Sequence, residues 1–316
     1  MNIDRTKTKS IRAAYGKTLA ELGKENENIV VLDADLACST QTAMFGKEFP
    51  ERFFNMGIAE QDMITTAAGL ASQGKIPFAS TFAMFATGRT YDQIRNSVAY
   101  PEFNVKIVAT HGGITVGEDG ASHQALEDVA LMRNIPHMTV VVPADCKECE
   151  EVIKYAATHK GPMYIRIART NVPDIFDENY KFDLKGKILR EGEDVTIVTN
   201  GETLAEVIEC AEILHKQGIQ AQILHLPVVK PLDNDIILKE AKKTRFVVTV
   251  ENHSVIGGLG SAVCEVLSEN MPTRVLRIGI NDEFGQSGEQ RKLMEFYSLT
   301  SEKLAEKIKE NLEETK

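Results

Sequence analysis

The sequence predicts an α/β protein of two domains, each a mostly parallel sheet flanked by helices. Three observations lead to this prediction. A chain of 316 residues is long for a single hydrophobic core. Short β-branched runs alternate with amphipathic helical segments, which is typical of parallel βαβ units. A charged stretch without sustained periodicity separates two such series, so we expect domains at 1–170 and 195–316, joined by residues 171–194 as a linker.

Hydrophobic periodicity and cap residues define the elements in order. Gly74 stands where a left-handed helix cap belongs, Pro101 stops a helix, and Asp145 with Glu148 forms a helix-capping pair. In the first unit, the expected elements are helix 10–22, strand 29–32, helix 59–73, strand 78–82, helix 87–100, strand 105–110, a helix starting near 122, strand 138–142 and strand 164–168. In the second unit, they are strand 195–199, helix 204–217, strand 221–226, strand 246–250, helix 261–267 and helix 301–312.

The composition indicates a soluble globular protein, with 43% hydrophobic and 26% charged residues. A net charge of −10 argues against nucleic acid and anionic membranes as partners. The sequence has no apolar run of about 18 residues and no apolar signal core, so a cytoplasmic location is expected. Five cysteines at scattered spacing suit reduced thiols. Cys146 and Cys149 form a lone CxxC, so no metal site is expected in this chain.

The stretch from Arg52 to Phe85 contains the first candidate functional residues. Glu60 begins its helix, where an acid can simply complement the helix dipole. The surroundings favour a functional interpretation as well. The helix carries small residues that let a flat ring approach closely, and Phe82 and Phe85 add two aromatic faces.

A set of polar residues could form one site. Its members are Ser39, Glu60, His111, Asp119, His123 and Arg169, with Arg12 as an outlying candidate. Each has an ordinary structural explanation, such as a backbone-bonded histidine, a turn aspartate or a surface arginine. Almost every member follows a predicted parallel strand, however, and the carboxyl ends of such strands gather at one edge of a sheet. The loop HGGITVGEDGASH (residues 111–123) has four glycines in thirteen residues, which permits close approach to a ligand.

Three motifs, FNMGIAEQDMITTAAGLA, ASTFAMF and GEDGASHQ, resemble the pyrimidine-binding half of transketolases, which use thiamine diphosphate. The resemblance extends along nearly the whole chain. It implies that Glu60 hydrogen-bonds the aminopyrimidine nitrogen N1′ of the cofactor. Proton sharing there favours the imino tautomer, whose 4′-nitrogen takes the proton from the thiazolium carbon. By the same resemblance Phe85 stacks on the pyrimidine and Phe82 is its neighbour.

The resemblance also assigns substrate contacts to the polar set. Asp119 would contact a sugar hydroxyl near the reacting centre, and His123 would bind the sugar oxygens and assist proton transfer. His111 would hold the sugar phosphate. Further phosphate contacts would come from Arg12, Ser39 and Arg169, and arginine suits this task because its donors pair two oxygens at once.

The GDG motif that holds the metal and diphosphate in this superfamily is missing from the sequence. The chain therefore resembles the C-terminal subunit of a split transketolase. A separate N-terminal subunit would supply the diphosphate site and Mg²⁺ (or Ca²⁺), with self-association into a heterotetramer. The second unit would serve packing and dimerisation.

Departures from the family pattern leave alternatives open. Gln61 gives the AEQ also seen in deoxyxylulose-phosphate synthases and in beta subunits of 2-oxo acid dehydrogenases. Gly88 or Arg89 stands where some transketolases carry a further pocket aromatic. Two rival interpretations remain: the chain is a subunit of a related thiamine diphosphate enzyme, or it is a non-catalytic ligand-sensing subunit.

Overall fold

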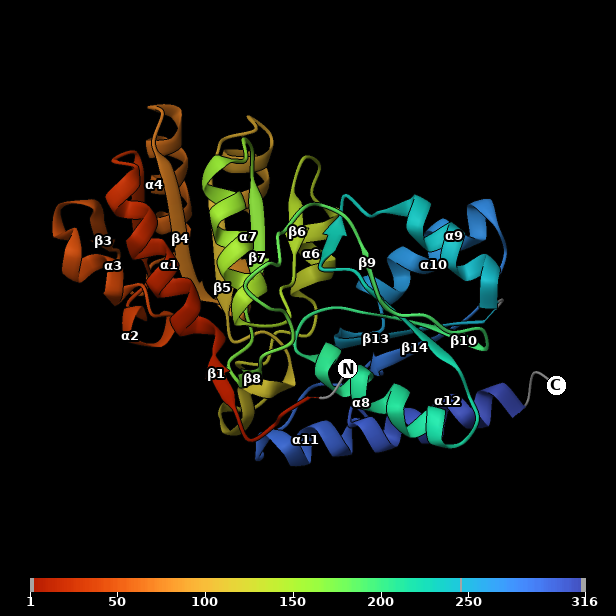
Figure 1. Ribbon diagram of the computed structural model, residues 1–316. Helices are drawn as coiled ribbons and strands as arrows, with labels where there is room; N and C mark the ends of the chain where they lie inside the picture. Colours follow the sequence, from red (N-terminus) through yellow and green to blue (C-terminus); the bar gives the residue numbers. More distant parts are fainter. Residues whose placement is uncertain (1–2, 245, 314–316) are drawn as a thin grey trace.

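The computed structural model describes residues 3–244 and 246–313. Two sheets lie side by side, each with helices around it, and the chain builds most of the first before it enters the second (Figure 1). The α/β class with two mostly parallel sheets is confirmed.

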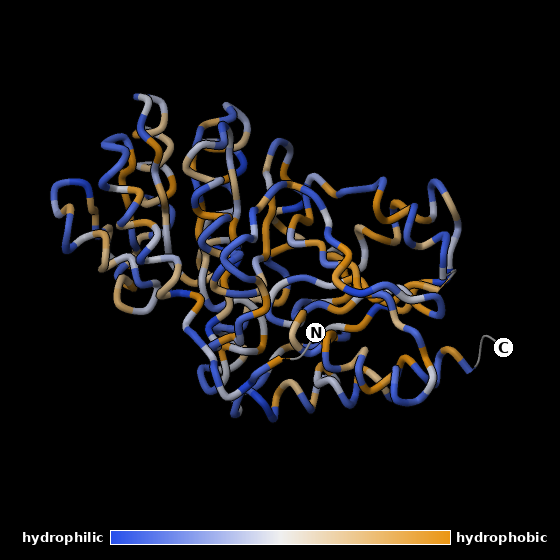
Figure 2. The backbone as a smooth tube through the Cα atoms, viewed as in Figure 1, coloured by the Kyte–Doolittle hydropathy of each residue, from blue (hydrophilic) through white to orange (hydrophobic). Residues whose placement is uncertain are grey.

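The first sheet has seven strands, and all neighbours are parallel except one edge pair, β12 with β6. Its order is β12 (Val228–Lys230), β6 (Thr139–Val141), β7 (Met163–Arg166), β5 (Lys106–Thr110), β4 (Ile76–Phe82), β2 (Ile29–Asp33) and β3 (Phe53–Asn55). Its inner strands are buried on both faces, so they carry the near-continuous hydrophobic runs visible in Figure 2.

Helices cover both faces of this sheet. On one face α1 (Ile11–Glu25) packs beside α7 (Cys146–Thr158) and α3 (Ala43–Glu48), around a core that includes Tyr15 and Val152. On the other face α4 (Glu60–Ser72) and α6 (Asp128–Asn134) bury Met63 and Val129. The expected cap of α7 is confirmed, since the Asp145 carboxylate accepts a hydrogen bond from the Glu148 amide.

The second sheet has five strands, with only β9 antiparallel to its neighbour. The order is β14 (Arg274–Ile280), β13 (Phe246–Ser254), β10 (Val195–Thr199), β11 (Ala221–His225) and β9 (Lys187–Arg190). One hydrophobic cluster packs this sheet against α8 (Thr203–Lys216), α11 (Gln290–Phe296) and α12 (Ser301–Glu313). Another packs it against α9 (Asn234–Thr244) and α10 (Leu259–Asn270).

Two segments cross between the units that the sequence suggests. Residues 171–194, expected to be a linker, contain β8 (Asn171–Pro173), which pairs with β1 (Thr8–Ser10), and also β9 of the second sheet. Strand β12 comes from the second half of the chain but pairs with β6 in the first sheet. The two sheets therefore share chain segments instead of being divided at one point.

Two helix predictions need correction. The helix expected from Ser122 begins only at Asp128, because the carbonyls of Ala125 and Leu126 accept bonds from Gly113 and Ser254 in other segments. The helix expected over 87–100 is mainly π-helical, with the turns Phe85–Arg89 and Ile94–Ala99 around the short α5 (Tyr91–Gln93). Such turns are rare and are frequently found at functional sites.

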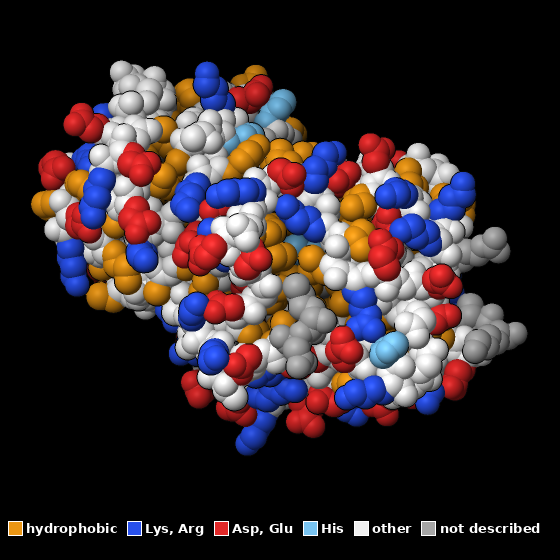
Figure 3. All heavy atoms as spheres, viewed as in Figure 1, with side chains coloured by type: hydrophobic (Ala, Val, Ile, Leu, Met, Phe, Trp, Pro, Cys, Tyr) orange, Lys and Arg blue, Asp and Glu red, His pale blue; other side chains and the backbone are white. Residues whose placement is uncertain are grey.

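A buried ion pair connects the sheets. The Arg166 guanidinium lies 2.9 Å from the Asp128 carboxylate and also donates to the Asn252 carbonyl of β13 at 2.7 Å. The hydroxyl of Tyr164 donates to the same carboxylate at 2.6 Å. Burial, with the charge of Asp128, raises the pKa of Tyr164 well above its usual value. In contrast, charged side chains of both signs are interspersed over the outer face seen in Figure 3.

Candidate active site

The predicted site residues gather at the carboxyl edge of the first sheet. Ser39 lies in α2 (Ala37–Thr40) after β2, and Glu60 begins α4 after β3. Phe82 ends β4, while His111 follows β5. Arg169 follows β7, and Arg12 lies in the first turn of α1, which the Ser10 hydroxyl caps by accepting from the Ala13 amide. This edge is where open α/β sheets bind ligands.

Four aromatic rings form one cluster at this edge. The His111 ring stacks on Phe82 with 3.7 Å between ring centroids, and Phe82 stacks on Phe85 at 6.0 Å. His123 meets Phe85 edge-on at 5.4 Å. The structure thus brings Phe82, Phe85, His111 and His123 together, as the sequence suggests, although they come from two separate segments.

A positive region borders this cluster. Arg12 donates to the Ser39 carbonyl at 2.7 Å, and Arg169 donates to the Val116 carbonyl at 2.6 Å. Burial, together with the nearby charge of Arg169, lowers the pKa of Arg12. The buried Nε of Arg12 has no hydrogen-bond partner among the described residues. Among the described residues neither arginine pairs with a carboxylate, and two such neighbouring arginines make a site suited to an anion.

His111 is held neutral in this environment. Burial first, then the charges of Arg12, Arg169 and His123, lower its pKa to about 3. Its Nδ1 lies 2.8 Å from the Thr110 hydroxyl. A neutral imidazole can donate to a phosphate oxygen without adding a third positive charge beside the two arginines.

We expect His111 to remain neutral from pH 5 to 8, since its folded pKa lies near 3 instead of 6.5. The unfolded chain binds more protons below about pH 6.5, so this residue's contribution to stability is complete above that pH. It is lost as the pH falls toward 3. Histidine-ring NMR of the folded protein would test this, with the urea-unfolded chain as a titrating control. A His111 signal that titrates between pH 6 and 7 in the folded protein would contradict the prediction.

Glu60 is buried, with 2% of its surface exposed, and both of its carboxylate oxygens contact one arginine nitrogen. Nη1 of Arg89 lies 2.7 Å from each of the two carboxylate oxygens. The same guanidinium lies over the Phe85 ring, 4.7 Å from its centroid. In the sequence, Arg89 is notable only because it departs from the transketolase pattern. Local periodicity does not predict the π-helical turn that ends at this residue.

The glycine loop is held in place by the second unit. Asn252 of β13 accepts from the Ile114 amide and donates to Glu202, and Gln124 donates to the Gln286 carbonyl. At Gly113, with a φ of +75°, a Cβ atom would lie 2.4 Å from the Asn252 side chain, so only glycine fits. Sequence reasoning missed these supporting residues.

The two remaining predicted residues lie on this loop. Asp119 ends the 3₁₀ turn Ile114–Asp119 and is exposed. His123 is partly buried, with Nδ1 at 3.0 Å from the Ser122 hydroxyl. Asp119 is the predicted site residue that the structure leaves on the surface, whereas His123 lies within the aromatic cluster.

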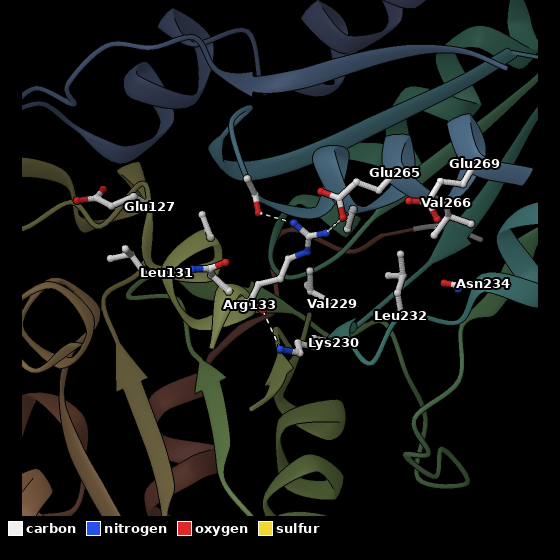
Figure 4. A pocket seen from close by; sticks show the side chains of 14 residues that line it. Glu127, Leu131, Arg133, Val229, Lys230, Leu232, Asn234, Glu265, Val266 and Glu269 are labelled. Atoms are coloured by element: carbon white, nitrogen blue, oxygen red, sulfur yellow. Dashed lines mark hydrogen bonds and ion pairs between the residues drawn. The ribbon is translucent and has the colours of Figure 1, made fainter. Parts of the chain in front are cut away.

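A groove of about 710 Å³ lies elsewhere, between α6, β12 and α10. None of the predicted site residues lines it. Its polar side chains connect the surrounding elements, since Arg133 pairs with Glu265 and Lys230 donates to the Arg133 carbonyl (Figure 4). The groove therefore resembles a junction between packed elements, separate from the candidate active site.

Two further features concern the described residues, 3–244 and 246–313. None of their helices is long and apolar enough to cross a bilayer. No group of three or more His, Cys, Asp or Glu side chains among them is placed to hold a metal ion.

The fold and the site define an α/β protein with an aromatic cluster and two arginines at the carboxyl edge of its first sheet. Residues 7–174 match the transketolase pyrimidine-binding domain, and residues 184–304 match the transketolase C-terminal domain. The chain belongs to the transketolase family, and the part of the family that it matches is the C-terminal section.

Individual relatives are also sections or subunits of transketolases. A Methanocaldococcus jannaschii protein described as a transketolase C-terminal section is 55% identical over 96% of each chain. The 6-deoxy-6-sulfo-D-fructose transketolase subunit of a Clostridium species is 44% identical, over 93% of this chain and 92% of its own. A solved structure described as a split gene transketolase, inactive beta4 tetramer, is 51% identical with a TM-score of 0.89. It covers 96% of this chain and 98% of its own.

Proposed function

We propose that this chain is the C-terminal subunit of a split transketolase, which transfers a two-carbon ketol unit between ketose and aldose phosphates. Thiamine diphosphate would bind at its interface with a separate N-terminal subunit. One observation carries the proposal: a buried carboxylate, an aromatic face and two arginines that have no acidic partner among the described residues converge at one sheet edge.

The residues present fit the pyrimidine half of the cofactor. The guanidinium of Arg89, itself flat and nitrogen-bearing, already lies on Glu60 and Phe85, so these two side chains accept a planar, nitrogen-bearing group. Glu60 would share a proton with ring nitrogen N1′, and Phe85 and Phe82 would hold the ring. Bound thiamine diphosphate supplies the nucleophilic carbon that takes up the two-carbon unit.

The polar residues would bind the sugar phosphate. Arg12 and Arg169 would pair with phosphate oxygens, with Ser39 and the neutral His111 as further donors. His123, beside Phe85, would hold the sugar oxygens and move a proton at the reacting carbon. Asp119 would contact a sugar hydroxyl from the glycine loop.

A partner subunit would complete the site. The sequence lacks the GDG motif, so we assign Mg²⁺ (or Ca²⁺) and the diphosphate contacts to that partner. The solved relative supports this division, since a tetramer of beta chains alone is described as inactive. We propose a heterotetramer of two chains of each kind.

Calorimetry would test the composite site. We expect thiamine diphosphate with Mg²⁺ to bind tightly only when this chain is mixed with an N-terminal subunit, and the mixture to transfer a ketol unit from a ketose phosphate. Each subunit alone is the control. Tight binding by this chain alone would mean that it holds a diphosphate site of its own, and the division between subunits would be wrong.

Gln61 favours a second candidate, a related thiamine diphosphate enzyme with another donor. In the structure its side-chain amide donates to the Arg89 carbonyl at 3.2 Å, so its contact lies within the chain. The substrate that the reconstituted enzyme uses as its carbon donor distinguishes the two candidates. Turnover of pyruvate without turnover of a ketose phosphate would favour the second.

A further inference from the structure

Arg89 contacts both groups that would hold the cofactor's pyrimidine. Its Nη1 lies 2.7 Å from Oε1 and from Oε2 of Glu60, so it stands between the two oxygens, on the outward side of the carboxylate. Its guanidinium carbon lies 4.7 Å from the centre of the Phe85 ring. One planar cation therefore occupies the carboxylate and the aromatic face together.

A pyrimidine ring cannot share this space with the guanidinium. A ring that stacks on Phe85 needs the face over which the guanidinium lies, and a ring nitrogen that shares a proton with Glu60 needs the direction that Nη1 takes. Both contacts of the ring would have to replace a contact of Arg89, so binding of the ring and this position of Arg89 exclude each other.

The Arg89 side chain can leave Glu60 and move into solvent. It is 46% exposed, whereas the Glu60 side chain to which it binds is 2% exposed. Arg89 ends the π-helical turn Phe85–Arg89, and a Cβ atom added at the exposed Gly88 before it would meet no other atom within 4 Å. Gln61 holds the Arg89 carbonyl, so the guanidinium can turn into solvent while the backbone stays in place.

We propose that Arg89 is a positioning residue that occupies the place of the aminopyrimidine ring in the cofactor-free chain and leaves Glu60 when that ring binds. The inference rests on the proposed function, because it concerns the same pocket. Arg89 keeps the buried carboxylate paired while the chain is alone, and its release is one step of cofactor binding.

This arrangement predicts a measurable effect on affinity. A site that is open only part of the time binds with an apparent Kd equal to the intrinsic Kd divided by the open fraction. If Arg89 covers Glu60 about nine-tenths of the time, its removal tightens thiamine diphosphate binding about tenfold. The KM of the ketose donor should not change, because Arg89 would not contact the sugar.

The test uses the chain reconstituted with its N-terminal subunit. Calorimetry would compare thiamine diphosphate binding by wild type, Arg89→Ala and Arg89→Gln, since the glutamine variant retains a neutral donor if the alanine variant folds poorly. Arg95→Ala is the matched control, because Arg95 lies on the next π-helical turn and its side chain donates to its neighbour Asn96, away from Glu60. We expect about tenfold tighter binding for both Arg89 variants and no change for the control.

A Glu60→Gln background completes the experiment. There the Arg89 substitution should change the Kd by much less than about tenfold, because the ion pair is already absent. Unchanged or weaker cofactor binding by the Arg89 variants, in a mixture whose wild type binds and turns over, would overturn this inference and leave the proposed function standing. A wild-type mixture that binds no thiamine diphosphate would overturn both.

Discussion

Glu60→Gln is expected to reduce ketol transfer by the reconstituted enzyme by about a hundred- to ten-thousandfold. In the proposed function the buried carboxylate would share a proton with the cofactor's ring nitrogen, and a glutamine amide cannot exchange a proton in this way. Because the substitution changes few atoms, we expect the fold to be retained. Steady-state rates with a ketose phosphate donor would measure the effect.

Asp62→Asn is the matched control for this experiment. Asp62 also lies in the first turn of α4, but it is exposed and two residues from the pocket carboxylate. The control variant should retain nearly full activity. If Glu60→Gln kept more than about a tenth of the wild-type rate, general acid–base catalysis through this residue would be ruled out.

Asp128→Ala is expected to lower the free energy of unfolding by about 3–5 kcal/mol. The substitution leaves the Arg166 guanidinium buried without its carboxylate, since the two side chains are only 3% and 0% exposed. It also removes the acceptor of the Tyr164 hydroxyl. Because Arg166 binds the Asn252 carbonyl as well, we expect the contact between the sheets to weaken together with the fold.

Urea unfolding followed by circular dichroism would measure this loss. Glu48→Gln serves as the control, because its ion pair with Lys24 is exposed and such pairs contribute little. A loss below about 1 kcal/mol for Asp128→Ala would show that water or a rearranged neighbour replaces the missing carboxylate.

The sequence was sufficient to predict the features that local chemistry encodes. The Asp145 cap, the buried strand at 29–32 and the helix that starts beside Glu60 all depend on residues close to one another in the chain. The placement of the site also follows, since parallel strands bring their carboxyl ends to one edge. The roles of the site residues stay predictions.

The contacts between distant segments were decided by the tertiary structure. Periodicity does not show that Arg89 covers Glu60, that Asn252 fixes the glycine loop or that β12 returns to the first sheet. The sequence pattern also predicts the start of α6 several residues too early. The helix begins later because the carbonyls of Ala125 and Leu126 accept hydrogen bonds from other segments. The physical reason is the same in each case: a buried polar group must be satisfied, and the partner that satisfies it lies wherever the packed chain brings one.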